Sequence, residues 1–431
     1  MNFKFLTIIM KQIISFTVAL LFLTITINSQ VISPESKKIS SVDYNRLGVI
    51  DNIINEYVQK HYLVGVTTLV IKDNTIVQYK GYGYADAESR KPMERDAIFR
   101  IMSQTKAITS VGIMILYEKG KLNLDEPIAD FIPEFRHPAV LDKYNAVDTT
   151  FSTVPARREI TFRDLLTHTS GIDYADIGSD KGKAIYAKAN IPSGLGEFNA
   201  SLLEKMKVLG KQPLLFQPGE KWQYGLNSDL LGCLIEVISG LSLEDFLRQN
   251  IFIPLGMNDT YFNLPASKAG RLAGVYTEDS TGHIIKWSHT FRNIDPDYPL
   301  KNKHYFSGGA GLSSTVYDYG IFLQMLLNGG IYNGRRILSP RSVELMTSPQ
   351  MDFPYSGSDY FGLGFGLTSA KSANRNVRNE GSYGWGGYYG TSYWVDPKAH
   401  LVCLIYTQQN PNSHYDFGTK FESAVYNSLI K

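Results

Sequence analysis

Two stretches rich in β-branched and aromatic residues, one near each end of the chain, show the pattern of paired β-strands. Residues 64–86 ("VGVTTLVIKDNTIVQYKGYGYAD") place such residues on both sides of Asp73-Asn74, a pair that favours a tight turn. Residues 390–409 repeat the pattern around Asp396-Pro397, and an amphipathic helix is expected over 417–430. Because these strands are separated by a long middle region, we predict one antiparallel sheet assembled from both ends of the chain.

The middle region favours helices. Apolar residues at helical spacing predict helices over residues 103–119, 161–167, 228–239, 243–250 and 316–327. Two long polar segments, 143–158 and 280–304, are expected to be loops that act as binding elements. The predicted fold class is therefore α/β, with a sheet domain interrupted by a mostly helical domain. The predicted limits are a signal peptide at 1–30, a sheet domain at 45–100 and 355–431, and a helical domain at 101–354.

Composition excludes several classes of function. The chain has 431 residues, of which 19% are charged, and a formal net charge of +2. No run of Lys and Arg is present, so we do not expect nucleic acid as a partner. The eight histidines are scattered without helical pairs, and neither a metal ion nor a cofactor is expected. Cys233 and Cys403 both lie in apolar segments and are expected to be unpaired core residues.

The N-terminal segment is typical of an export signal. Lys11 is followed by an apolar run, Ile13 to Ile27, and then by the polar residues Asn-Ser-Gln, with either Met1 or Met10 as the start. No Cys follows the run, so a lipoprotein is not indicated. We expect a periplasmic or secreted protein without a membrane span once the signal is removed. The alternative is an uncleaved anchor, for which the run is short.

A Ser and a Lys lie three residues apart where one of the predicted helices begins. In "FRIMSQTKAITS", Ser103 precedes Lys106, so both face the same side of a helix. One interpretation is structural, because serine is a common residue at a helix N-terminus. The other is chemical, because an amine beside a hydroxyl can remove its proton and make a nucleophile. The spacing by itself does not decide between them.

Six motifs in order give the chain a resemblance to a known family. They are "SQTK" at Ser103, "ITFRDLLTHTSGI" at Ile160, "WQYGLNSDLLG" at Trp222, "IFIPLGMNDTYF" at Ile251, "GGAGLSSTVYDY" at Gly308 and "WGGYYGTSYWVDP" at Trp385. Together they resemble the serine β-lactamase-like hydrolases, which include class C β-lactamases, D,D-peptidases and family VIII carboxylesterases. The likeness covers about residues 64–406 and implies a β-lactamase/transpeptidase-like fold.

The resemblance also implies roles for individual residues. Ser103 corresponds to the acylated nucleophile, Lys106 to the amine that assists its deprotonation, and Tyr224 to the tyrosine that moves protons to and from the leaving group. The oxyanion hole would consist of the backbone N–H groups of Ser103 and Tyr388. His168, in "THTSG", is expected to be a turn and packing residue.

Two departures from the family pattern bear on the substrate. The β-lactamases and D,D-peptidases usually have Asn two residues after this Tyr, whereas this chain has Leu226, with Asn227 one residue later. They also usually have a Lys-Thr-Gly strand, where this chain has Trp385-Gly386-Gly387. These five residues are our candidates for substrate binding. The combination of SQTK, Tyr-x-Leu and Trp-Gly-Gly resembles the family VIII esterases, because the Asn and Lys that would hold a β-lactam or a peptide are missing.

We therefore expect a secreted or periplasmic serine hydrolase that cleaves carboxylic esters through an acyl-enzyme on Ser103. One alternative is an amide hydrolase of the β-lactamase or D,D-peptidase type. A second alternative is a non-catalytic protein that uses the same fold to bind the cell wall. The presence of Ser103, Lys106 and Tyr224 together argues against the second alternative.

Overall fold

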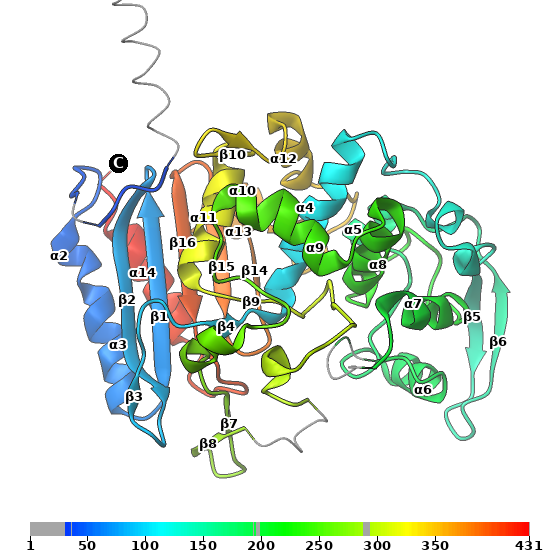
Figure 1. Cartoon of the computed structure of the whole chain (residues 1–431), viewed down its shortest axis with the longest axis horizontal. Helices are drawn as coiled ribbons and strands as arrows, with labels where there is room; N and C mark the ends of the chain where they lie inside the picture. The colour runs from blue at the N-terminus through cyan, green and yellow to red at the C-terminus, as the bar shows by residue number, and fades with distance from the viewer. Residues whose placement is uncertain (1–30, 36, 193, 195–198, 288–293, 431) are drawn as a thin grey trace, which may run out of the picture.

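A computed structural model describes residues 31–35, 37–192, 194, 199–287 and 294–430. Its central feature is an eight-stranded sheet with the strand order β12-β13-β14-β15-β16-β1-β2-β3, in which all neighbours are antiparallel (Figure 1). Its strands are β1 (Gly65–Lys72), β2 (Thr75–Asp86), β3 (Lys91–Pro92), β12 (Tyr360–Phe361), β13 (Gly366–Leu367), β14 (Tyr383–Gly386), β15 (Ser392–Asp396) and β16 (Leu401–Tyr406). The predicted signal peptide, residues 1–30, lies outside the described residues.

The two ends of the chain meet in the middle of this sheet. Strand β1 pairs with β16, with Thr67 opposite Tyr406 and Lys72 opposite Leu401. All eight residues of β1 are buried, because both faces of the sheet are covered at this point. The predicted antiparallel sheet built from both chain ends is thus confirmed.

Helices from both ends of the chain cover one face of the sheet. These are α2 (Tyr44–Leu47), α3 (Val49–Gln59) and α14 (Phe417–Asn427), whose apolar residues share a core with the sheet (Figure 1). On the other face, α11 (Val316–Leu327) packs against β1 and β16. Gly320 allows this close packing, because a Cβ there would lie 2.5 Å from the side chain of Leu69. The sheet is therefore sandwiched between two helical layers.

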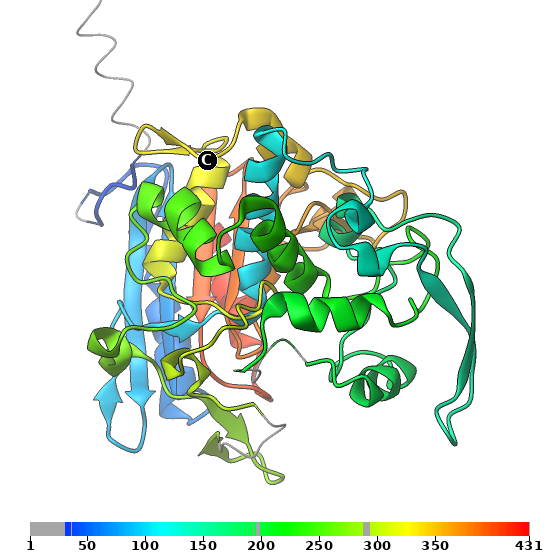
Figure 2. The same ribbon diagram turned by 45° about the vertical axis from the view of Figure 1, so that its right-hand side comes forward.

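Nine further α-helices are described. They are α4 (Thr105–Glu118), α5 (Phe162–Leu166), α6 (Asp180–Lys188), α7 (Leu202–Gly210), α8 (Asn227–Ser239), α9 (Leu243–Leu247), α10 (Ile253–Leu255), α12 (Pro340–Met346) and α13 (Ala370–Ala373). Helix α4 packs against α8 and α9, and its buried side chains belong to the large core that also includes the α11 face of the sheet. Figures 1 and 2 show α4 between the sheet and the group of helices that includes α5 and α8. No helix among the described residues combines the length and apolar character needed to cross a membrane.

Four short two-stranded sheets lie outside the main sheet. They pair β4 (Phe99–Arg100) with β9 (Ser313–Ser314), β5 (Ala139–Tyr144) with β6 (Phe151–Pro155), β7 (Tyr276–Glu278) with β8 (Ile284–Lys286), and β10 (Ile331–Tyr332) with β11 (Arg335–Arg336).

The prediction of a loop over 143–158 is wrong, because β5 and β6 form a hairpin there that projects from the helical region (Figure 2). All five residues of β6 are exposed, so no alternation of buried and exposed positions marks this strand in the sequence. The segment 280–304 contains β8 and a 3₁₀ turn at Tyr298–Leu300, while 288–293 lies outside the described residues.

Other expectations are confirmed or adjusted. Cys233 and Cys403 are free and buried, as predicted. The helix predicted over 243–250 ends as an α-helix at Leu247 and continues as a π-helical turn over Arg248–Phe252. The proposed domain limits stay a prediction.

Candidate active site

Ser103 lies on a tight turn just before helix α4. The turn is a 3₁₀ helix, Met102–Gln104, and α4 begins at Thr105, two residues later than predicted. The Ser103 side chain forms no capping hydrogen bond, so the structural interpretation of this serine as an N-cap does not hold. Met102 has a φ of 49°, a left-handed conformation that is unfavourable for a side chain of this type. Such strain is found preferentially where a functional side chain has to be presented.

Lys106 lies one helical turn after Ser103 and faces it. Lys106 Nζ is 3.2 Å from Ser103 Oγ and donates a hydrogen bond of 2.7 Å to the carbonyl oxygen of Gly309. The Lys106 side chain is buried. Gly308 allows the loop that carries Gly309 to pass between α4 and α8, because a Cβ at Gly308 would overlap the carbonyl oxygen of Ser228. The hydrogen bond to the Gly309 carbonyl thus holds the Lys106 amine beside the Ser103 hydroxyl.

Tyr224 approaches the same point from the segment before α8. Lys106 Nζ lies 4.6 Å from the centre of the Tyr224 ring. The segment runs against the loop after α5, where the Gln223 N–H donates to the His168 carbonyl at 2.9 Å. A Cβ at Gly225 would overlap the carbonyl oxygen of Ile172, so glycine is required for this approach. The structure therefore brings Ser103, Lys106 and Tyr224 together.

A group of aromatic rings fixes the orientation of Tyr224. Trp385 Nε1 donates a hydrogen bond of 3.2 Å to the Tyr224 hydroxyl. Ring centres of His168, Tyr174 and Trp222 lie 5.0, 5.4 and 5.9 Å from that of Tyr224. Trp385 thus belongs to the site, where it both contacts Tyr224 and forms part of the wall around it.

The end of strand β14 lies beside the serine turn. A Cβ at Gly387 would be 2.5 Å from the carbonyl oxygen of Ile101, two residues before Ser103. The Gly387 N–H donates to the Thr391 carbonyl at 2.7 Å and closes a turn that contains Tyr388. The Tyr388 ring packs against Trp287, with ring centres 6.5 Å apart. Tyr388 and Ser103, the predicted oxyanion-hole residues, are consequently carried by two segments in contact.

Leu226 and Asn227 differ from the other candidates. Leu226 is fully buried in the main hydrophobic core. Asn227 is also fully buried; its Oδ1 accepts a hydrogen bond of 2.5 Å from Ser170 Oγ, and its Nδ2 lies 2.9 Å from His168 Nδ1. The structure brings neither side chain to a surface that a substrate can reach, because both residues, at the start of α8, are buried against the core.

Comparison with known proteins identifies the family of this arrangement. The family model described as Beta-lactamase matches residues 50–425. The chain belongs to the beta-lactamase family. A relative from Mycobacterium tuberculosis, Protein Rv1367c, is 33% identical over 376 residues, which cover 84% of this chain and 90% of the relative. Esterase EstB of Burkholderia gladioli is 28% identical, over 83% of this chain and 89% of its own.

A solved structure supports the same fold. It is that of "EstCE1, a hydrolase with promiscuous acyltransferase activity", with a TM-score of 0.76 and 25% sequence identity. The match covers 89% of this chain and 99% of the other. The beta-lactamase/transpeptidase-like fold predicted from the motifs is therefore confirmed.

Burial shapes the electrostatics of this beta-lactamase-family site. Burial and the nearby charge of Lys106 lower the pKa of His168 well below its usual value, so its ring is neutral. Burial, followed by the charge of Tyr224, raises the pKa of the Tyr174 hydroxyl. His168 is thus a buried packing and hydrogen-bonding residue, in agreement with its predicted role. In the described part of the chain no group of three or more His, Cys, Asp or Glu side chains could hold a metal ion.

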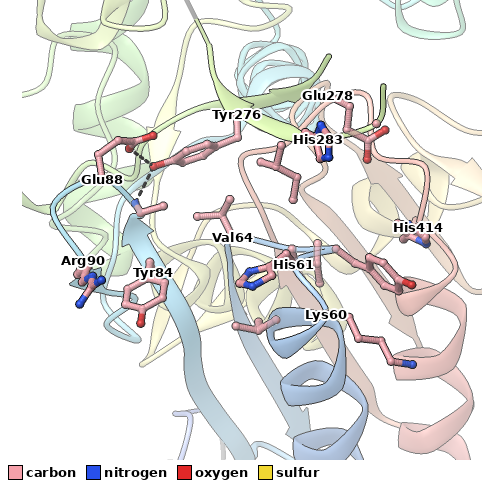
Figure 3. A pocket seen from close by; sticks show the side chains of 16 residues that line it. Lys60, His61, Val64, Tyr84, Glu88, Arg90, Tyr276, Glu278, His283 and His414 are labelled. Carbon is pink, nitrogen blue, oxygen red and sulfur yellow. Dashed lines mark hydrogen bonds between the residues drawn. The ribbon is translucent and has the colours of Figure 1, made fainter. Parts of the chain in front are cut away.

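A separate hollow of about 780 Å³ lies at the other end of the sheet from the helical region, between the end of α3, the β2–β3 turn and the β7–β8 hairpin (Figure 3). His61 and His283 face each other across it, and Tyr276 donates a hydrogen bond of 2.8 Å to Glu88 at its edge. Its described lining contains no Ser, Thr or Cys. This hollow therefore offers no hydroxyl or thiol nucleophile of these three types among its described lining residues.

Sequence reasoning missed two contributors to the site. Gly309 supplies the carbonyl that anchors Lys106, and Tyr174 places its ring 5.6 Å from Lys106 Nζ. Gly309 belongs to the quoted motif "GGAGLSS", which could have suggested a close backbone approach. Tyr174 has no comparable signal, because its position depends on how the loop after α5 folds back.

Proposed function

We propose that this protein is a serine hydrolase that cleaves carboxylic esters through an acyl-enzyme on Ser103. The observation that supports this most directly is the convergence of three groups: Ser103 Oγ 3.2 Å from Lys106 Nζ, and the Tyr224 ring over the same amine. A serine hydroxyl becomes a useful nucleophile only when a base is placed to accept its proton. Membership of the beta-lactamase family and the likeness to Esterase EstB add to this argument.

In the proposed acylation step, Ser103 Oγ attacks the ester carbonyl carbon while its proton moves to the Lys106 amine. The carbonyl oxygen becomes an oxyanion, for which the backbone N–H groups of Ser103 and Tyr388 are the candidate donors. As this intermediate collapses, the bond to the alcohol oxygen breaks. The proton then passes from Lys106 through the Tyr224 hydroxyl to the departing alkoxide, and an alcohol leaves.

Deacylation reverses the proton path. A water molecule attacks the acyl-Ser103 ester and gives its proton to the Tyr224–Lys106 pair. The bond between the acyl carbon and Ser103 Oγ then breaks, and the proton returns to Oγ. The products are a carboxylic acid and the free enzyme, and no metal or cofactor takes part.

The preference for esters rests on the surroundings of Tyr224. The position where the resemblance leads one to expect a lysine is occupied by Trp385, whose indole already donates to the Tyr224 hydroxyl. The rings of Trp222 and Phe361 also lie near Trp385, with centres 6.5 and 5.4 Å away. An apolar wall of this kind suits an acyl or alcohol chain better than the carboxylate of a β-lactam or a D-Ala peptide.

The test is active-site labelling followed by a substrate panel. A fluorophosphonate probe should add one adduct to the wild type and none to Ser103→Ala, as measured by intact mass. Short-chain p-nitrophenyl esters should then exceed nitrocefin and D-Ala-D-Ala peptides in kcat/KM. A wild type that takes no label would refute the hydrolase, and efficient nitrocefin turnover would favour the amide-hydrolase alternative.

We also propose that the protein is exported, on the basis of the apolar run Ile13–Ile27 after Lys11. N-terminal sequencing of the protein purified from its native host should find a first residue beyond Ile27. Recovery of a protein that retains residues 13–27 would show an anchored form instead.

A further inference from the structure

Asp229 is a charged side chain in the first turn of the otherwise apolar helix α8. It is 1% exposed, and the helix around it is almost entirely buried. Charged side chains are rarely buried to this degree unless another group balances the charge. Its place in the first turn favours a negative charge, because the N-terminal end of a helix is electropositive. The remaining question is which cation it serves.

Gly309 lies beside both Asp229 and Lys106. A Cβ built on Gly309 would lie 2.8 Å from Asp229 Oδ2, 3.4 Å from the Tyr174 hydroxyl and 3.5 Å from Lys106 Nζ. The carboxylate oxygen and the amine nitrogen are therefore no more than about 6 Å apart, and the Gly309 carbonyl accepts the hydrogen bond from Lys106. Any larger residue at 309 would fill the space between the two groups.

The burial of Asp229 raises the pKa of its carboxyl group. Neither of its oxygens has a hydrogen-bond partner of good geometry among the described residues. Burial raises the pKa of Asp229 to about 6, while Ser307, the charge of Lys106 and the Gly309 N–H oppose this shift. A carboxyl group so placed is ionised above about pH 6 and protonated below it.

We propose that Asp229 is a positioning residue that balances the charge of Lys106 when this amine accepts the proton of Ser103. The inference rests on the proposed function, and it adds a fourth group to that site. The proton transfer creates an ammonium in a buried position, and an ionised carboxylate beside Gly309 lowers its energy. Asp229 touches neither the substrate nor Ser103, and it acts only through Lys106.

Other titratable groups surround this pair, and the experiment has to separate them. They are Tyr174, Tyr224, Tyr305 and His168, with Lys106 itself. Tyr174 and His168 are neutral around pH 6, because burial raises the pKa of Tyr174 and lowers that of His168. Asp229, whose pKa is about 6, changes its charge in this range.

The experiment compares Asp229→Asn with the wild type across pH 5 to 9. A unit charge roughly 6 Å away, at an effective dielectric constant of about 20, changes a charge-forming step by up to about 100-fold. We expect Asp229→Asn to lose about 10- to 100-fold in kcat with p-nitrophenyl butyrate at pH 8, with little change in KM. The fall of kcat/KM below pH 6 that we expect in the wild type should be absent from the variant, because asparagine does not titrate.

Asp318→Asn is the matched control. Asp318 is also buried, and burial raises its pKa to about 6, but it lies on α11 and accepts hydrogen bonds from Asp259 N and Thr260 Oγ1. This variant should keep the pH profile of the wild type. A folded Asp229→Asn enzyme with the kcat and acid limb of the wild type would overturn the inference alone. A wild type that takes no fluorophosphonate label would overturn it together with the proposed function.

Discussion

Replacing Gly387 by Ala should test the role of the turn that carries Tyr388, one of the two proposed oxyanion-hole residues. The new Cβ would lie 2.5 Å from the carbonyl oxygen of Ile101 and would also overlap Thr391 Oγ1. The threonine side chain can rotate, whereas the carbonyl belongs to the backbone that leads into the Ser103 turn. Relieving this contact requires a displacement on the order of 1 Å between the two segments. Misplacement of that size costs about 10²-fold in rate, or roughly 3 kcal/mol of transition-state stabilisation.

The assay is the steady-state hydrolysis of p-nitrophenyl butyrate, with folding checked by circular dichroism. We expect kcat of Gly387→Ala to fall about 100-fold while KM changes little, because the oxyanion forms only during reaction. Gly418→Ala is the control: this glycine lies in α14, which carries none of the candidate site residues, and a Cβ there would meet nothing within 4 Å. A folded Gly387→Ala enzyme as active as Gly418→Ala would refute the placement of the oxyanion hole at this turn.

Three further predictions follow from single contacts. Asp229→Asn should gain stability relative to the wild type as pH rises. The pKa of Asp229, raised from an ordinary 3.8 to about 6, makes the wild type lose up to roughly 3 kcal/mol of unfolding free energy between pH 4 and 6. Urea unfolding at pH 4.5 and 7.5 would detect this loss in the wild type and its absence from the variant. Trp385→Phe removes the hydrogen-bond donor to the Tyr224 hydroxyl and should lower kcat/KM about tenfold. An unchanged kcat/KM would show that this hydrogen bond does not contribute to catalysis. Asn227→Leu should cost about 1–3 kcal/mol of unfolding free energy by leaving the partners of the amide unpaired, with KM unchanged, whereas a raised KM would indicate substrate contact.

Sequence reasoning succeeded where a local signal and the tertiary structure agree. Asp73 and Asn74 both have positive φ, as a tight hairpin turn requires, and the turn joins β1 to β2 as predicted. The helix over 316–327 has the predicted bounds, because Thr315 caps its start. The hairpin of β5 and β6 was missed because exposed strands lack a hydrophobic pattern.

The candidate site was predictable to different degrees. The three-residue spacing of Ser103 and Lys106 needs only local helical geometry, and the structure places the two groups within hydrogen-bond distance. Which way Leu226 and Asn227 point depends on the rotation of α8 against the core, and no pattern in the sequence determines it. Asp229 was overlooked because the group it lies near, Lys106, is more than a hundred residues away in the sequence and on another helix.

The pairing of β1 with β16 has a consequence for the synthesis of the protein. Lys72 in β1 pairs with Leu401 in β16, which is synthesised much later. Because a chain grows at roughly 5–20 residues per second, β1 lacks β16 as a neighbour for on the order of tens of seconds. During that interval an apolar strand with eight residues destined for burial has an open edge, which invites pairing with other chains. The edge of β1 therefore stays open to such pairing until the last strands of the sheet emerge. Loss of even the final thirty or so codons would leave the sheet permanently divided.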